Sequence, residues 1–387
     1  MIPEKTFADA KFYDKLIAIF FTSDGCNECD KLFEKVSAMS IIKQKYYLFK
    51  FNAIEYLQYS VRLTRGVIPT ISVVNPKGQL LAIIESTNED YIEDKLKEIY
   101  YGRNKLKPLE YQEPKELEEV NPIDFYDIIN YTLDGNPIDF RTVEFLKFYS
   151  SIHKEYERVL NIMKPADPLA KYLLTGEKPQ LDYTYTSNIA ISIVLGIDET
   201  VKDELIKRID ENGKVYRSNR KEVKGLLIDE ALAGEALITL YERTFDETYL
   251  NMAKKIAEYI DKALSTPIGF RDSENEDLIT SYIVYEPLAN SEASIFFARL
   301  WAVTDDEKYR ESSKKAMNIS YTLGDDIRVL SRIAISYIKL NELIKAKKPV
   351  QDLRVEVVKD NGCPDEELRY KDNNCYKDIN EIKSVLL

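Results

Sequence analysis

The sequence has 387 residues, of which 44% are hydrophobic, and a formal net charge of −12 at pH 7. A chain of this length exceeds what one hydrophobic core ordinarily organises, so we expect two domains. The whole excess of acidic residues lies beyond residue 108. Because such a surface repels phosphate backbones, nucleic acid is excluded as an expected partner.

The sequence shows no targeting or membrane-spanning pattern. The only early apolar run, residues 16–21, is too short for a secretory signal, and no run reaches the ~20 apolar residues of a spanning helix. We therefore expect a soluble, cytoplasmic protein without a membrane partner. Four cysteines, one histidine and 27 tyrosines in a chain with 31% charged residues suggest a thermophilic source, where intracellular disulfides are less exceptional.

Residues 1–108 alternate between short apolar runs and helical patterns, which indicates an α/β domain. Strands are predicted over residues 16–21, 46–51, 67–74 and 80–84, and helices over residues 9–15, 29–39, 54–63 and 87–100. Pro76 and Gly78 favour a tight turn between the last two strands, which therefore form a hairpin. A Cys-x-x-Cys pair, Cys26 and Cys29, stands between the first strand and the helix that follows it.

The order of these elements and motifs over residues 10–100 resembles thioredoxin. The resemblance implies that Cys26 is the attacking thiolate and Cys29 the resolving thiol. It also implies that Pro69 follows a cis peptide bond and exposes the backbone of Ile68 to an extended substrate. A helix N-terminus at Cys26 would favour the thiolate, which is the form that attacks disulfides.

Three features near Cys26 depart from the thioredoxin pattern. Phe20 occupies the position of a buried acid six residues before Cys26, and Gly25 replaces the usual aromatic residue. Carboxylates at three further positions, Asp24, Glu28 and Asp30, oppose the helix dipole. We therefore expect less thiolate at neutral pH than in a dedicated oxidant. The alternative interpretation is a vestigial module with an inert cysteine pair.

Residues 109–122 are rich in proline and glutamate and are predicted to be a linker. Asn121-Pro122 and Asn136-Pro137 both carry the signature of a helix start. Helical periodicity then dominates residues 123–346, with a repeat at an offset of 60 that relates residues 244–249 to residues 304–309. In each copy a Thr-x-x-Glu sequence, from Thr244 or Thr304, predicts a capping box.

The predicted helices cover residues 226–243, 244–264, 287–304, 305–321 and 325–346, and hairpins of this kind must stack to bury their apolar faces. With the N-terminal module, nearly the whole chain resembles a family that fuses a thioredoxin-like domain to a six-hairpin, glycosidase-like (α/α) toroid, the relatives of spermatogenesis-associated protein 20. Residues 226–259 and 287–315 match best. Fewer than 250 residues cannot supply the ~12 helices of a full toroid, so we expect an α/β domain followed by a truncated toroid-like array.

Acidic residues of the helical domain are candidates for sugar chemistry, because toroids of this shape often process sugars. They are Asp229, Glu230, Glu235, Glu286 and Glu292. Glycoside hydrolysis needs two carboxyl groups that face each other at a defined separation, and the plainer interpretation of these residues is helix caps and solvated faces. A single histidine, His153, cannot act as both acid and base, which disfavours sugar epimerisation.

Residues 347–387 are predicted to form a small tail with a strand over residues 353–358 and a helix over residues 378–387. Cys363 and Cys375 suggest a stabilising disulfide. Alternatively, the four cysteines form a zinc site, for which only Cys26 and Cys29 have tight ligand spacing. A third possibility is disulfide exchange between the two cysteine pairs. We expect neither a metal nor a cofactor.

Three functions follow from these observations. The first is a thiol–disulfide oxidoreductase-like protein that uses Cys26 and Cys29, with a helical domain that binds a protein partner or disulfide substrate. The second is a carbohydrate-active enzyme that depends on Glu230 or Glu292. The third is a non-enzymatic scaffold with vestigial sites, whose acidic helical surface recruits another protein.

Overall fold

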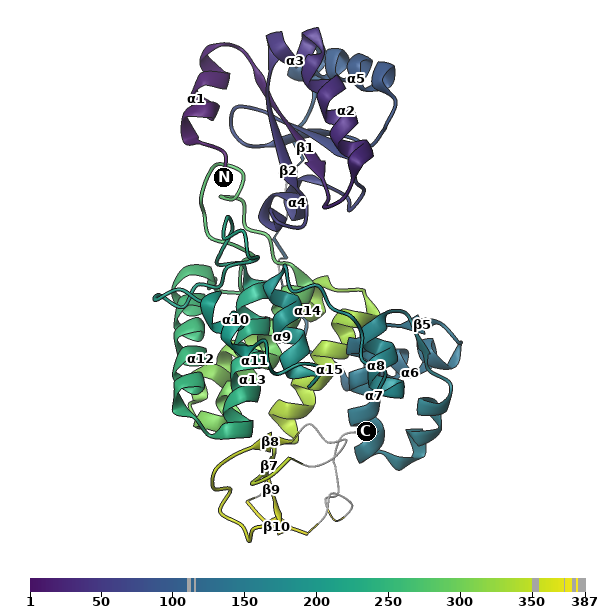
Figure 1. Cartoon of the computed structure of the whole chain (residues 1–387), viewed down its shortest axis with the longest axis vertical. Helices are drawn as coiled ribbons and strands as arrows, with labels where there is room; N and C mark the ends of the chain where they lie inside the picture. Colours follow the sequence, from purple (N-terminus) through teal and green to yellow (C-terminus); the bar gives the residue numbers. More distant parts are fainter. Residues whose placement is uncertain (110–112, 115, 350–354, 372, 378–380, 382–387) are drawn as a thin grey trace. The chain divides into compact units, whose positions relative to one another are not determined.

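The computed structural model describes residues 1–109, 113–114, 116–349, 355–371, 373–377 and 381. It is a mixed α/β and helical structure, as predicted, and it divides into two compact units (Figure 1). The first unit comprises Met1–Glu113 together with Asp272–Val284, and the second comprises Pro114–Arg271 and Tyr285–Leu387. Within the described residues, no helix combines the length and apolar character needed to cross a membrane.

The first unit is built on a four-stranded mixed sheet with the order β2-β1-β3-β4. Strand β1 pairs in parallel with β2 and antiparallel with β3, which pairs antiparallel with β4. The strands are β1 (Leu16–Thr22), β2 (Tyr46–Asn52), β3 (Thr70–Val74) and β4 (Leu80–Ile84), and the helices are α1 (Glu4–Phe12), α2 (Asn27–Ala38), α3 (Ser40–Lys45), α4 (Leu57–Leu63) and α5 (Glu89–Gly102).

Strand β1 is buried along its whole length, which explains its continuous apolar sequence. Successive side chains of a strand point to opposite faces. Ala18 and Phe20 accordingly join a hydrophobic cluster with residues of α2 and α5. Ile17 and Phe21 join a second cluster with residues of α1 and α4. The sheet therefore has a core on each face, and β1 carries the chain through the middle to the Cys-x-x-Cys pair.

Residues 272–284 belong to the first unit although they lie between helices of the second unit in the sequence. Ile279 is 1% exposed and belongs to the hydrophobic cluster of α1 and α4. Arg62 on α4 forms a bidentate ion pair with Asp272, with both N···O distances at 2.6 Å. Tyr59 donates a hydrogen bond to Asp277. This segment supplies both apolar and charged partners to α4, which sequence patterns did not indicate.

The second unit is mainly helical, with a hydrophobic core that runs through its longest helices. The helices are α6 (Phe125–Leu133), α7 (Phe140–Ile152), α8 (Pro168–Thr175), α9 (Thr186–Val194), α10 (Lys202–Lys207), α11 (Leu227–Thr244), α12 (Glu247–Tyr259), α13 (Pro287–Thr304), α14 (Glu307–Leu323) and α15 (Ile327–Asn341), with a short parallel pairing between β5 (Pro137–Ile138) and β6 (Lys164–Pro165). Helices α11 and α12 form one hairpin and α13 and α14 another, and five helices contact one another in the order α9-α11-α13-α15-α7.

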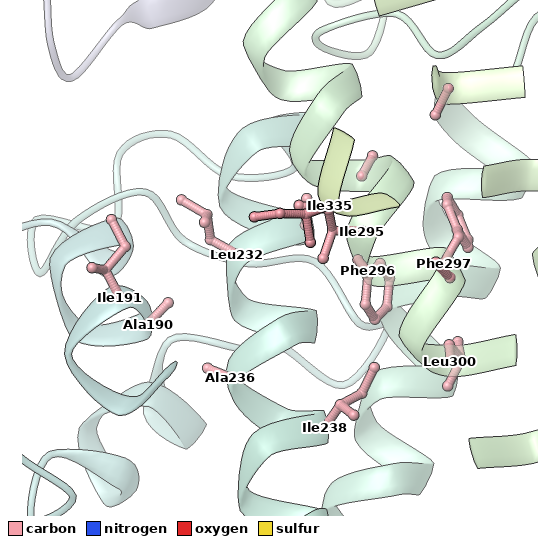
Figure 2. Close-up of a cluster of buried hydrophobic side chains, with 14 of the residues drawn as sticks. Ala190, Ile191, Leu232, Ala236, Ile238, Ile295, Phe296, Phe297, Leu300 and Ile335 are labelled. Atoms are coloured by element: carbon pink, nitrogen blue, oxygen red, sulfur yellow. The ribbon is translucent and has the colours of Figure 1, made fainter. Parts of the chain in front are cut away.

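Figure 2 shows the hydrophobic contacts between α9, α11 and α13 in this unit. Phe296 and Ile295 of α13 are fully buried, as are Ala236 and Ile238 of α11. Gly234 of α11 permits this close packing, because a Cβ atom at its position would lie 2.3 Å from the ring of Phe296. Helices α11 and α13 are apolar on most sides because neighbours surround them.

The start signals of several helices differ from those predicted. The N-caps of α12 and α14 are Asp246 and Asp306, whose side chains accept hydrogen bonds from the backbone of the residue two positions later. The predicted capping boxes at Thr244 and Thr304 are therefore wrong, because these threonines bond back to carbonyl groups of the preceding helix. An aspartate nearer the helix start serves the first free N–H groups better.

The two Asn-Pro signals have different outcomes. Asn121 caps a short 3-10 helix, Pro122–Asp124, that leads into α6. Asn136-Pro137 does not start a helix, because Pro137–Ile138 form β5 and the N-cap of α7 is Asp139.

A second four-stranded sheet, of order β10-β9-β7-β8, forms the C-terminal part of the second unit. Its strands are β7 (Ile344–Ala346), β8 (Glu356–Val357), β9 (Leu368–Tyr370) and β10 (Cys375–Tyr376). The predicted helix over residues 325–346 is too long, since α15 ends at Asn341 and the last three residues pair with β8 and β9. The predicted helix over residues 378–387 and the start of the predicted strand at residues 353–354 lie outside the described residues, Glu381 excepted.

Candidate functional site

The Cys-x-x-Cys pair lies where β1 ends and α2 begins. Gly25 has a φ of 74°, which places it in the left-handed region and turns the chain into the helix. Cys26 is the N-cap of α2, and its Sγ accepts a hydrogen bond from the N–H of Cys29 at 3.2 Å. The two cysteines form a disulfide. Cys29 is 0% exposed whereas Cys26 is only partly buried, so Cys26 carries the accessible sulfur.

Two aromatic rings pack in the same hydrophobic cluster as the buried cysteine. Phe20 is fully buried and its ring packs edge-on against Phe33, with the centroids 5.3 Å apart. Both residues lie in the hydrophobic cluster that contains Cys29. Phe20 offers no proton acceptor, so a proton leaving Cys29 during exchange must pass to another group or to water.

The carboxylates around the pair have partners that sequence analysis missed. Asp30 pairs with Lys50 of β2 at 2.6 Å, and the Lys50 ammonium also lies 4.9 Å from the ring centroid of Phe33. Glu28 pairs with Lys31 at 2.8 Å, and this hydrogen bond lowers the pKa of Glu28. The side-chain amide of Asn52 donates to Asp24 at 2.8 Å. Local cations therefore offset part of the negative charge that we expected to oppose the thiolate.

The second predicted element of the site, the entry to β3, contributes to the same hydrophobic cluster. The peptide bond between Ile68 and Pro69 is cis. Ile68 is partly buried and packs against the cluster that also receives Cys26. Val67 is 48% exposed, and its carbonyl accepts a hydrogen bond from the Thr70 hydroxyl at 2.6 Å. The fold thus brings Cys26, Cys29 and Ile68 to one cluster.

The acidic candidates of the helical unit are buried rather than solvated. Asp229, Glu230, Glu235 and Glu292 are all 0% exposed, which contradicts the interpretation of solvated faces. Glu230 accepts a hydrogen bond from the N–H of Val215 at 2.7 Å, and burial raises its pKa well above the usual value. Asp229 pairs with Arg217 at 2.8 Å. Glu286 is the N-cap of α13, as the plainer interpretation predicted.

Arg332 of α15 stands at the centre of a buried ion cluster. Its guanidinium contacts Glu292 at 2.5 Å, Glu235 at 3.4 Å and Glu144 of α7. Burial raises the pKa of Glu235 to about 7. Burial acts in the same direction on Glu292, but the guanidinium groups of Arg332 and Arg141 outweigh it and lower the pKa of that carboxyl group. These carboxylates are held by cations and are not free to act on a substrate.

A second buried ion cluster surrounds Arg299 of α13. The guanidinium contacts Glu242 at 2.8 Å and Glu356 at 3.4 Å, and Lys339 also pairs with Glu356. Burial raises the pKa of Glu242 to about 8. Burial would also raise the pKa of Glu356, but Lys339 and Arg299 lower it to about 2. At neutral pH one proton is therefore retained on Glu242 beside an ionised Glu356.

These shifts predict that the helical unit loses stability as the pH rises from about 5 to 8. Between the ordinary glutamate pKa of 4.5 and the raised values, folded Glu235 and Glu242 hold protons that the unfolded chain has released. Glu235 alone should lower the free energy of unfolding on the order of 3 kcal/mol across this window. Urea unfolding at pH 5.5, 7 and 8.5 measures the effect.

The matched variants for this pH prediction are Glu235→Gln and Glu199→Gln. The first removes one of the two titrating groups and should reduce the slope of the pH profile, with Glu242 supplying the remainder, whereas Glu199 has an exposed carboxylate and its variant should keep the full slope. A free energy of unfolding that rises between pH 5.5 and 8.5 would contradict the prediction. Below pH 4.5 the sign reverses, because Glu292 and Glu356, whose pKa values are lowered, then gain protons and lose their ion pairs.

An open cavity of about 780 Å³ lies at the N-terminal ends of α7, α8 and α15. Its carboxylates include Asp139, Asp167 and Asp326, which are the N-caps of these three helices. None of the five acidic candidates lines it. Because the carboxylates that do line it mostly serve as helix caps, the cavity does not present the pair of free carboxyl groups that glycoside hydrolysis needs.

The remaining predicted site residues lie in the helical unit. Cys363 and Cys375 form a disulfide, so all four cysteines of the chain are oxidised. His153 is 8% exposed, and its ring lies 4.5 Å from that of Tyr149, as expected of a structural histidine. Among the residues with described positions, no three metal-binding side chains gather into a possible metal site.

Comparisons with known proteins give no family for this chain. No protein-family model matches it, and no curated protein matches it either.

Proposed function

We propose that the chain is a thiol–disulfide oxidoreductase-like protein whose first unit has a thioredoxin fold. The observation that carries this proposal is the disulfide at the start of α2, in which the N-cap Cys26 is partly exposed and Cys29 is buried. The β2-β1-β3-β4 strand order and the helices on both faces support the fold. The position of Ile68 beside the same cluster as Cys26 supports a substrate groove.

The chemistry begins from the reduced pair. The Cys26 thiolate attacks a substrate disulfide, a mixed disulfide forms, and the substrate's other sulfur leaves as a thiolate and takes up a proton. Cys29 then loses its proton and attacks Cys26, which releases the second substrate thiol and closes the disulfide that the structure contains. The N–H of Cys29 and the helix dipole stabilise the Cys26 thiolate in the first step. An external dithiol returns the two electrons.

We also propose that the helical unit is a truncated (α/α) toroid that binds a protein partner or the disulfide substrate. The paired hairpins and the neighbour order α9-α11-α13-α15-α7 support this architecture. A carbohydrate-active enzyme is not proposed, because Glu230 and Glu292 are fully buried and the cavity carboxylates mostly cap helices.

Reduction of insulin by dithiothreitol, followed by turbidity, tests the proposed activity. Cys26→Ser should reduce catalysis to the uncatalysed rate, and Cys29→Ser should accumulate a mixed disulfide that mass spectrometry detects. A Cys363→Ser/Cys375→Ser variant should retain the activity, which assigns it to the N-terminal pair. Insulin reduction that is unchanged in Cys26→Ser would refute the proposal.

A further inference from the structure

The disulfide between Cys363 and Cys375 has one buried and one exposed end. Cys363 is 5% exposed, and its N–H donates to the side-chain oxygen of Asn361 at 3.0 Å. Asn361 is itself fully buried, and its amide donates to the carbonyl groups of Lys345 and Glu367 at 3.1 Å and 2.9 Å. Cys375 is exposed and lies on β10, at the edge of its sheet. An incoming thiolate can therefore reach Cys375 more readily than Cys363.

The guanidinium group of Arg369 lies beside this disulfide and donates to two neutral oxygen atoms. Arg369 of β9 pairs directly with Cys375 of β10. Its Nη1 donates to the carbonyl of Asn361 at 3.4 Å and lies 3.5 Å from the place that a Cβ would occupy on Gly362, the residue before Cys363. Its Nη2 donates to the side-chain oxygen of Asn373 at 2.6 Å. Both of these oxygens are neutral, so neither hydrogen bond neutralises the positive charge of the guanidinium.

We propose that the Cys363–Cys375 disulfide is a second redox-active site that accepts electrons from a vicinal dithiol. A cation beside a cysteine stabilises its thiolate, and a stabilised leaving thiolate speeds exchange and favours the reduced pair. Arg369 supplies this charge next to both cysteines. This inference concerns the tail alone and does not rest on the activity proposed for Cys26 and Cys29.

The exchange balances without any further reactant. One thiolate of the dithiol attacks the sulfur of Cys375, the bond between Cys375 and Cys363 breaks, and Cys363 leaves as a thiolate that takes up a proton. The second thiol of the donor loses its proton and attacks the donor sulfur in the mixed disulfide, which releases Cys375. The donor becomes a disulfide and the tail pair gains two electrons. The reduced Cys26–Cys29 pair belongs to the same chemical class of donor.

Reduction would free the edge strand of the sheet. Strand β10 pairs with β9 through Cys375 with Arg369 and Tyr376 with Leu368. Tyr376 packs, partly buried, against the hydrophobic cluster of this sheet. The disulfide adds a covalent link to this two-residue strand, so we expect its reduction to loosen β10 and to increase the exposure of the Tyr376 side chain.

The test uses a Cys26→Ser/Cys29→Ser chain, in which the tail disulfide is the only one. This variant, in its folded state, is incubated with increasing concentrations of dithiothreitol or with glutathione. The reaction is quenched by alkylation, and the modified cysteines are identified by mass spectrometry. We expect reduction while the circular dichroism stays native, and the first glutathione adduct on Cys375. Arg369→Gln should slow the exchange by about threefold, because the leaving thiolate loses the cation beside it, whereas Arg369→Lys should stay near the parent rate.

Three outcomes would overturn the proposal. They are a disulfide that resists dithiothreitol until the protein unfolds, a first adduct on Cys363, and equal rates for Arg369→Gln and Arg369→Lys in natively folded protein. A second experiment identifies the dithiol that donates electrons to the tail disulfide. It compares the rate of tail reduction in the chain with and without Cys26 and Cys29 under limiting dithiothreitol. Faster tail reduction in the intact chain assigns the donor to its own pair, and equal rates assign it to an external dithiol.

Discussion

Replacing Asp272 by asparagine is expected to destabilise the first unit by about 3–5 kcal/mol, the usual cost of removing one partner from a buried ion pair. The side chain of Arg62 is 0% exposed, and its guanidinium forms a bidentate ion pair with Asp272. Asparagine keeps the shape but removes the negative charge that pairs with the buried guanidinium. Hydrogen exchange of peptides from β1 to α4, followed by mass spectrometry, measures the loss of protection in this unit.

Two control variants make the Asp272 prediction sharper. Glu89→Gln breaks a solvent-exposed pair with Lys35 in the same unit and should leave exchange unchanged, because such pairs contribute little. Arg62→Leu/Asp272→Leu removes both charges and should recover much of the protection, since apolar replacement of a whole buried pair is often tolerated. Similar exchange in Asp272→Asn and Glu89→Gln would show that Asp272 does not carry this stability.

Replacing Arg332 by methionine is expected to destabilise the helical unit by about 3–5 kcal/mol at pH 7. The variant leaves Glu292, Glu144 and Glu235 buried without the guanidinium that contacts all three. The single tryptophan, Trp301, is 9% exposed in the same unit. Its fluorescence during urea unfolding therefore measures the change.

The loss in free energy of unfolding caused by Arg332→Met should be smaller at pH 5 than at pH 8. At the lower pH the buried carboxylates that contacted Arg332 can take up protons. Arg328→Gln is the matched control, since Arg328 lies on the same helix and forms a half-exposed pair with Asp326. That variant should change the unfolding midpoint little at either pH. A cost of Arg332→Met that is equal at pH 5 and pH 8 would show that the carboxylates are stabilised by other groups.

Local patterns predicted the elements well where the stabilising contacts are also local. The predicted helix over residues 287–304 coincides with α13, and the apolar run after residue 15 coincides with the start of β1. Errors arose where two local signals competed. Thr244 and Asp246 can both cap a helix, and only the backbone path decides that Asp246 does so.

The candidate cysteine site was predictable in part, because a Cys-x-x-Cys pair between a strand and a helix is a local motif. Its electrostatics were not, since the cation beside Asp30 is Lys50, which a parallel strand 20 residues away brings into place. The same limit applies to Arg332, whose partner Glu144 is 188 positions away in the sequence. Charge counts along a sequence cannot show which carboxylates are buried or which cations they meet.

Residues 272–284 have a consequence for how the protein is made. The core of the first unit needs Ile279, and Arg62 needs its partner Asp272. The ribosome adds these two residues some 160–170 positions after Glu113, where the first stretch of this unit ends. At translation rates of about 5–20 residues per second, this delay is roughly 10–35 seconds. During this time the nascent first unit lacks the residues that pack against and pair with α4. Its completion therefore waits until most of the helical unit has been synthesised.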